Sequence, residues 1–134
     1  MRLLTIGLAG LMALAASAAV AQAPAEPYGV WINHHQTVKV ETRSCGDLLC
    51  GSVVWATPEA REVAKEYGTD PLIGTQLLSG YRHTRDGTWQ GQVFVPDLRR
   101  HFFSRIEQVG PDKLKISGCI MGGLLCKSQT WTRA

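Results

Sequence analysis

The sequence of 134 residues lacks the segments that identify several large classes of protein. After residue 21 it has no apolar run of about 20 residues, so it predicts no membrane-spanning helix there. It has no Gly-rich loop of the Walker or dinucleotide-binding type, no Gly-x-Ser-x-Gly and no His-Glu-x-x-His. The formal net charge is only +3, and no stacking platform on a basic groove is recognisable. We therefore expect no catalytic residues, no cofactor and no nucleic-acid partner.

The acidic residues and histidines also lack the spacing of a catalytic or metal-binding site. Four of the acidic residues fall at polar positions or in turns, namely Glu41, Asp97, Glu107 and Asp112. The histidines are His34, His35, His83 and His101. Because His34 and His35 are adjacent on an expected strand, their side chains should point to opposite faces and cannot share a metal. We predict no metal site.

The first 21 residues form the one long apolar stretch of the chain. Met1-Arg2-Leu3 carries a single positive charge, residues 4–16 are almost wholly apolar, and Ala19-Val20-Ala21 has the small-x-small pattern of a signal-peptidase site. The sequence therefore predicts a signal peptide over residues 1–21, a Pro-bearing tether over residues 22–28 and a single domain over residues 29–134. We expect export to the periplasm or further secretion.

Four cysteines remain after the predicted cleavage, namely Cys45, Cys50, Cys119 and Cys126. In an oxidising compartment they indicate two disulfides, and the short spacings favour local pairs. A turn at Asp47–Leu48 would place Cys45 opposite Cys50, and a turn at Gly122–Gly123 would place Cys119 opposite Cys126. The alternative is a four-thiolate zinc site, but its usual spacing fits only the first pair.

Short runs of apolar and polar residues, separated by turn residues, fill most of the chain from Tyr28 onward. The runs expected as strands are residues 29–35, 37–43, 49–55, 72–82, 88–95, 100–108, 113–121 and 124–133. After the third run, Thr57-Pro58 and the helical spacing of Ala60, Val63, Ala64 and Tyr67 predict one short helix. The predicted fold class is all-β, with about eight antiparallel strands in a small up-and-down barrel. A two-sheet sandwich is the alternative.

Both ends of the expected domain carry a tryptophan. Gly29-Val30-Trp31 stands on the first expected strand and Trp131-Thr132-Arg133 on the last. A Gly-x-Trp on the first strand with a late arginine on the last resembles the lipocalin-like (calycin) barrels. The resemblance implies that Gly29, Trp31, Trp131 and Arg133 close one end of the barrel, where the arginine lies across an indole face.

A wider set of motifs occurs in order along the chain. The most specific are Cys45-Gly46-x-x-Leu49-Cys50-Gly51 and Gln129-Thr130-Trp131-Thr132-Arg133, and the others include Val53-Val54-Trp55 and Pro71-Leu72-Ile73-Gly74. This pattern resembles the bacterial envelope family called domain of unknown function 2147, over nearly all of the predicted mature chain. The resemblance implies a small exported domain with a lipocalin-like barrel. The chain departs from the family after Trp55, where a helix replaces an Asn-Pro-rich loop. It departs again after Pro96-Asp97, where Leu98-Arg99-Arg100-His101-Phe102 stands in place of Gly-Lys-x-Tyr.

An eight-stranded barrel is either packed solid or holds one small ligand. The candidate ligand contacts are Trp55, Trp89, Phe102 and Arg105. Gly80, Gly91 and Gly118 each fall within an expected strand, where a glycine leaves room for a ligand or permits a bend. The preferred hypothesis is a non-catalytic barrel that binds a small apolar or anionic amphipathic molecule.

Charge is divided unevenly along the chain. Residues 22–80 carry 4 basic and 7 acidic side chains, a net of −3, whereas residues 81–134 carry 9 basic and 4 acidic, a net of +5. A basic wall or rim would favour an anionic ligand or envelope surface. The alternative hypothesis is therefore a ligandless module that contacts an envelope protein or surface through a basic face.

Overall fold

A computed structural model of the chain describes residues 10, 12–17 and 26–134. The predicted signal peptide over residues 1–21, with its cleavage site, and the tether over residues 22–28 fall mainly outside the described residues. No helix within the described residues is long and apolar enough to cross a membrane.

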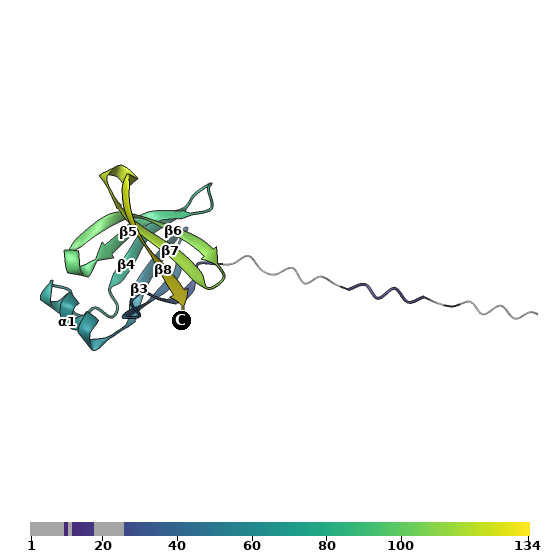
Figure 1. The fold of residues 1–134 in the computed structure, drawn as a ribbon, viewed down its shortest axis with the longest axis horizontal. Helices are drawn as coiled ribbons and strands as arrows, with labels where there is room; N and C mark the ends of the chain where they lie inside the picture. Colours follow the sequence, from purple (N-terminus) through teal and green to yellow (C-terminus); the bar gives the residue numbers. More distant parts are fainter. Residues whose placement is uncertain (1–9, 11, 18–25) are drawn as a thin grey trace, which may run out of the picture.

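In the described part of the chain, eight antiparallel strands close into a barrel in chain order (Figure 1). They are β1 (Gly29–Ile32), β2 (Val38–Cys45), β3 (Leu48–Ala56), β4 (Gln76–His83), β5 (Trp89–Val95), β6 (Arg100–Gly110), β7 (Lys113–Ile120) and β8 (Leu125–Arg133). The helix α1 (Pro58–Glu66) follows β3, and the short 3-10 turns η1 (Pro96–Leu98) and η2 (Met121–Gly123) follow β5 and β7. The predicted all-β barrel with one helix after the third strand is confirmed, and the sandwich alternative is wrong.

The ring of strands is closed by a short contact between its first and last members. β1 pairs with β8 only through Trp31–Arg133 and Ile32–Thr132, whereas β7 pairs with β8 along its whole length. Within the described residues, the part of β8 over residues 125–130 thus has a partner strand on one side only. The barrel is closed at the end that holds Trp31 and open at the end that carries η1, η2 and α1.

Helix α1 begins where the sequence predicts. The Thr57 hydroxyl accepts a hydrogen bond from the Ala60 amide at 3.1 Å, which caps the helix. Ala64 is buried in the core, but Val63 and Tyr67, which share the predicted apolar stripe, are 42% and 45% exposed. The helix therefore packs on the barrel through a narrower face than its sequence suggests.

The first strand is shorter than predicted. It ends at Ile32 because the Asn33 side chain accepts a hydrogen bond from the Thr37 amide at 2.8 Å, which closes a turn over residues 33–37. His34 and His35 therefore lie in this turn, with ring centroids 5.3 Å apart. The prediction that they point to opposite faces of a strand is wrong.

The fourth strand begins at Gln76, later than the predicted residue 72. The Thr75 amide donates a hydrogen bond to the Leu72 carbonyl at 3.0 Å, and Gly74 has a φ of 92°. Residues 72–75 thus form a turn, in a backbone conformation that glycine adopts readily. The turn buries the Leu72 side chain in the same core as Ala64.

Both predicted disulfides are present, and the described residues contain no free cysteine. Cys119 lies directly opposite Cys126 in the β7–β8 register, with their Cα atoms 4.1 Å apart. This arrangement is the one predicted from the Gly122–Gly123 turn. The pairing favours disulfides over the zinc alternative.

The turn beside the other disulfide is displaced by one residue from the prediction. Gly46, with a φ of 64°, and Asp47 form the turn, so that Cys45 pairs with Leu48. Cys50 lies two residues further along β3, and the disulfide joins the strands diagonally across a Cα–Cα distance of 6.0 Å. A glycine at the first turn position tolerates the positive φ, and this preference fixes the turn.

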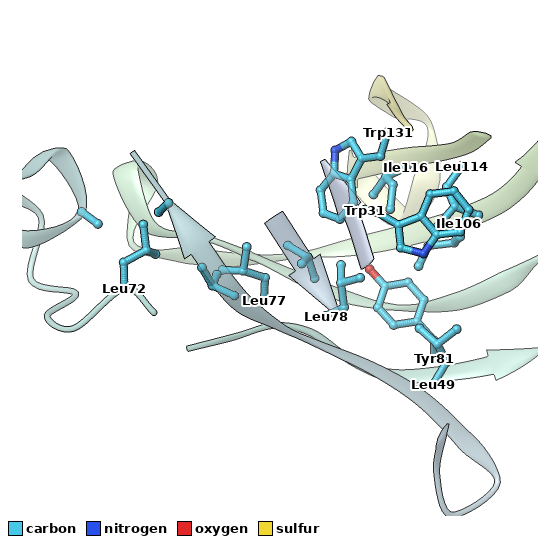
Figure 2. Close-up of a cluster of buried hydrophobic side chains, with 14 residues drawn as sticks. Trp31, Leu49, Leu72, Leu77, Leu78, Tyr81, Ile106, Leu114, Ile116 and Trp131 are labelled. Atoms are coloured by element: carbon cyan, nitrogen blue, oxygen red, sulfur yellow. The ribbon is translucent and has the colours of Figure 1, made fainter. Parts of the chain in front are cut away.

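The core extends from the closed end of the barrel to α1. Figure 2 shows Trp31, Trp131, Ile106, Ile116 and Leu114 gathered at one side of the cluster, with Leu72 and Leu77 at the other. Trp31, Ile106, Leu114 and Tyr81 are fully buried. The Tyr81 hydroxyl points from β4 toward the Trp31 side of the cluster (Figure 2). The barrel interior around Trp31 and Tyr81 is packed solid.

Candidate ligand-binding site

The inward face of the barrel follows from the register of β5, β6 and β7. Ser104 lies opposite Gly91 on one neighbouring strand and opposite Gly118 on the other, and it is fully buried. Because side chains alternate between the two faces of a strand, Phe102 and Ile106 share its inward face. Phe102 is nearer the open end, and Ile106 is nearer the closed end.

Gly91 and Gly118, which lie opposite Ser104 on the two neighbouring strands, have different surroundings. A Cβ atom on Gly91 would stand 2.7 Å from the Ser79 carbonyl oxygen and 2.7 Å from Cγ of Tyr81, so the tyrosine ring packs on bare backbone. A Cβ atom on Gly118 would find its nearest neighbour, Val93, at 3.7 Å. The barrel interior therefore has no room for a side chain at Gly91 but has room for a methyl group at Gly118.

A hollow of about 490 Å³ opens beyond Gly118, and we call it the mouth cavity. Its apolar walls are Val95, Leu98, Phe102, Gly118, Ile120 and Leu125. Its remaining walls are Cys126, Lys127 and Gln129 of β8. Because this part of β8 has no second partner strand, its inward side chains face an opening instead of a closed core. The volume falls within the range of ligand sites in proteins, and most of the lining residues are apolar.

A second hollow, also of about 490 Å³, adjoins the mouth cavity beside α1. The two hollows share Val95 and Gln129 as walls, and the second also includes Ala60 and Val63 of the helix. The open end of the barrel thus offers two neighbouring spaces with mainly apolar walls.

Lys127 is the one charged side chain among the residues that line the mouth cavity. It lies opposite Gly118 in the β7–β8 register, where the facing position has no side chain. An ammonium group at the rim of an apolar hollow attracts an anion and repels a cation. The cavity is therefore suited to a molecule with an apolar body and an anionic end.

Titratable groups with shifted pKa values lie apart from one another. The hydroxyls of Tyr81 and Ser104 are buried, and burial raises the pKa of Tyr81. Asp86 lies in the β4–β5 turn, where hydrogen bonds from Thr84 and Thr88 lower its pKa to about 2. Among the described residues, no three histidine, cysteine or carboxylate side chains are grouped as metal ligands.

The four candidate ligand contacts are dispersed over the barrel. Phe102 lines the mouth cavity, whereas Trp89 lines a separate hollow at the closed end. Trp55 is on the outer surface, with the Lys39 ammonium 5.0 Å from its ring centroid. Arg105 is exposed, on the face of β6 opposite to its buried neighbours. The ligand-binding role of all four stays a prediction, and the geometry favours Phe102.

The sequence analysis missed most walls of the mouth cavity, among them Val95, Leu98 and Lys127. A signal for Lys127 was present in the sequence. The predicted pairing of Cys119 with Cys126 places Gly118 opposite Lys127, one residue along each strand. No comparable signal exists for Leu98, because its position depends on how the η1 turn folds over the opening.

A glycine, a tryptophan and an arginine pack together at the closed end of the barrel. The Arg133 guanidinium lies 4.2 Å from the Trp31 ring centroid and donates hydrogen bonds at 2.9 Å to the carbonyls of Tyr28 and Pro111. A Cβ atom on Gly29 would stand only 2.7 Å from Nη1 of Arg133, so the glycine leaves room for the guanidinium. The arginine lies across the indole, as the resemblance to lipocalins implies.

Comparisons with known proteins agree with this architecture. A search of curated proteins found no relative with significant sequence similarity. The solved structure of protein HP1028 from Helicobacter pylori, described as belonging to the lipocalin family, has a TM-score of 0.64 and 14% sequence identity, over 81% of this chain and 83% of that chain. At this identity the likeness shows a shared lipocalin-like fold. The family model described as "Uncharacterized protein conserved in bacteria (DUF2147)" matches residues 29–133, so the chain belongs to the DUF2147 family.

Proposed function

We propose that this chain is a non-catalytic barrel that binds a small apolar or anionic amphipathic molecule in the mouth cavity. The observation that carries the proposal is the contrast between the two halves of the barrel. Around Gly91 the interior is packed, whereas beyond Gly118 a hollow of about 490 Å³ has mainly apolar walls. Ligand sites in proteins have volumes of about 300–1,000 Å³ and predominantly apolar linings.

We also propose that the chain is exported. The support is the signal-peptide pattern of residues 1–21 and the two disulfides, which form and persist in oxidising compartments. The mass of the mature protein tests this proposal, because cleavage after Ala21 leaves a chain that begins at Gln22. A mature chain that retains residues 1–21 would contradict it.

The ligand is tested by native mass spectrometry of protein purified gently from its producing cells, followed by organic extraction. We expect an adduct that disappears on denaturation and is absent from Gly118→Leu, because a leucine side chain there occupies the cavity. The matched control is Gly110→Leu, since Gly110 has open space around it and lines only the hollow at the closed end. A bare wild-type mass would favour the ligandless interaction module, and an adduct lost only from Gly110→Leu would move the site to the closed end.

The charge of Lys127 predicts which ligands are preferred. Lys127→Glu should weaken the binding of laurate about tenfold and leave the binding of dodecanol nearly unchanged, because only the carboxylate interacts with the ammonium group. The effect should diminish at high salt, since the group lies at an exposed rim. Isothermal titration with both compounds measures it, and Lys115→Glu is the control, because Lys115 lies exposed on β7 outside the cavity lining. Equal losses for laurate and dodecanol would contradict a headgroup role for Lys127.

A further inference from the structure

Two turns at the open end carry large apolar side chains that the described residues leave uncovered. Met121 and Leu124, in and after η2, are 67% and 80% exposed, and Leu98 of η1 is 59% exposed. Leu98 and Leu125 both line the mouth cavity, so the two turns border one opening. Leu125 is itself 57% exposed. We call Leu98, Met121, Leu124 and Leu125 the apolar rim.

The segments that carry the apolar rim are basic. Residues 96–100 and 120–127 hold three basic side chains, Arg99, Arg100 and Lys127, and one acidic side chain, Asp97. The Arg100 guanidinium stands 5.2 Å from the Phe102 ring centroid, beside the cavity. Arg99 extends instead toward Gly68 at the end of α1. Arg100 and Lys127 are therefore the cations nearest the opening.

Acidic groups lie on the other side of the open end. Glu59 and Asp97 line the second hollow, beside α1, and neither lines the mouth cavity. The η2 side of the opening thus combines exposed apolar side chains with the positive charge of Lys127, the one charged residue of segment 120–127. This combination is typical of surfaces that bind anionic membranes.

We propose that the apolar rim docks on an anionic phospholipid bilayer, with its side chains between the headgroups and Arg100 and Lys127 against the phosphates. Two protruding turns with a hollow between them fit a deformable lipid surface better than a rigid protein. A protein interface of standard size needs about 800 Å² of continuous surface on each partner. Docking in this way brings the opening of the mouth cavity against the bilayer, from which an amphipathic molecule can enter it.

The test is co-sedimentation of the purified protein with vesicles of phosphatidylcholine and phosphatidylglycerol in equal parts, and with vesicles of phosphatidylcholine alone. We expect binding to the anionic vesicles that is at least about tenfold stronger, because each cation near an anionic bilayer strengthens binding about fivefold. Met121→Ser with Leu124→Ser should weaken binding at least about tenfold through the loss of inserted apolar surface. Arg100→Glu with Lys127→Glu should weaken it to a similar extent.

Matched controls separate the rim from general surface effects. Val54→Ser with Val109→Ser changes two exposed valines elsewhere on the barrel, and Lys113→Glu with Lys115→Glu reverses two exposed charges on β7. Both controls should bind the anionic vesicles like the wild type. The proposal would be overturned if the control variants lost as much vesicle binding as the rim variants. It would also be overturned if the wild type did not bind anionic vesicles. A wild-type dimer that the two rim serines dissociate would identify the rim as a self-association surface and would also overturn it.

The vesicle-binding test can fail or succeed independently of the test of ligand binding in the mouth cavity. Laurate binding without vesicles should persist in Met121→Ser with Leu124→Ser, because neither residue lines the mouth cavity. Vesicle binding without laurate binding would refute the ligand site alone. Laurate binding without vesicle binding would refute the membrane surface alone.

Discussion

Replacing Trp31 by alanine should lower the free energy of unfolding by about 3–5 kcal/mol. The Trp31 side chain is fully buried, and its indole N–H donates hydrogen bonds to the Pro27 carbonyl at 3.0 Å and the Thr42 hydroxyl at 3.2 Å. The Arg133 guanidinium lies over the ring, 4.2 Å from its centroid. Truncation leaves a large cavity at the closed end and removes the contact that joins β1 to β8 through Arg133.

Chemical denaturation followed by circular dichroism measures this loss. The matched control is Trp55→Ala, because Trp55 is 40% exposed on the outer surface, and we expect it to cost less than about 1 kcal/mol. Arg133→Ala should cost about 1–2 kcal/mol, since a cation–π contact and its hydrogen bonds contribute less than a buried indole. Equal stability losses for Trp31→Ala and Trp55→Ala would refute the role of Trp31 in closing the barrel.

Gly91→Ala should destabilise the protein by about 2–3 kcal/mol, whereas Gly118→Ala should change its stability by less than about 0.5 kcal/mol. The added methyl group on Gly91 would stand 2.7 Å from the Ser79 carbonyl oxygen and 2.8 Å from Cα of Tyr81. Backbone atoms cannot move aside without disrupting the β4–β5 pairing. The added methyl group on Gly118 meets nothing closer than 3.7 Å.

The two alanine variants form a natural pair, because both glycines lie opposite Ser104 on neighbouring strands. Thermal melting of the two under the same conditions measures the difference. Equal melting temperatures would mean that the interior is equally loose around both glycines. That result would remove the contrast on which the proposed ligand site rests.

The position of Trp55 illustrates a limit of pattern reasoning. Strict alternation from buried Val53 would turn Trp55, a candidate ligand contact, inward. A bulge between Lys39 and Val40 places Val54 as an extra residue in β3, so that Trp55 turns outward and contacts Lys39 instead. One inserted residue reverses the face of everything beyond it, and nothing in the local sequence marks the bulge.

Arg105 is a different case, because the sequence contained the information on which way its side chain points. It lies between Ser104 and Ile106, both fully buried, and a strand residue between two inward neighbours points outward. The apolar character of Ile106 indicates this orientation. Phe102, two residues before Ser104, shares the inward face by the same rule.

The sequence by itself determined the features that depend on neighbouring residues. Alternating runs and turn residues specified the antiparallel strands, Thr57 specified the start of α1, and the short spacings favoured both cysteine pairs. Only the tertiary structure decided which half of the barrel is hollow and that Lys127 borders it. These features depend on bulges, on the short β1–β8 contact and on the fold of η1 and η2 over the opening. Each of these features depends on the pairing register of all the strands. In a closed barrel the registers of the strands are determined jointly and not by any one strand pair.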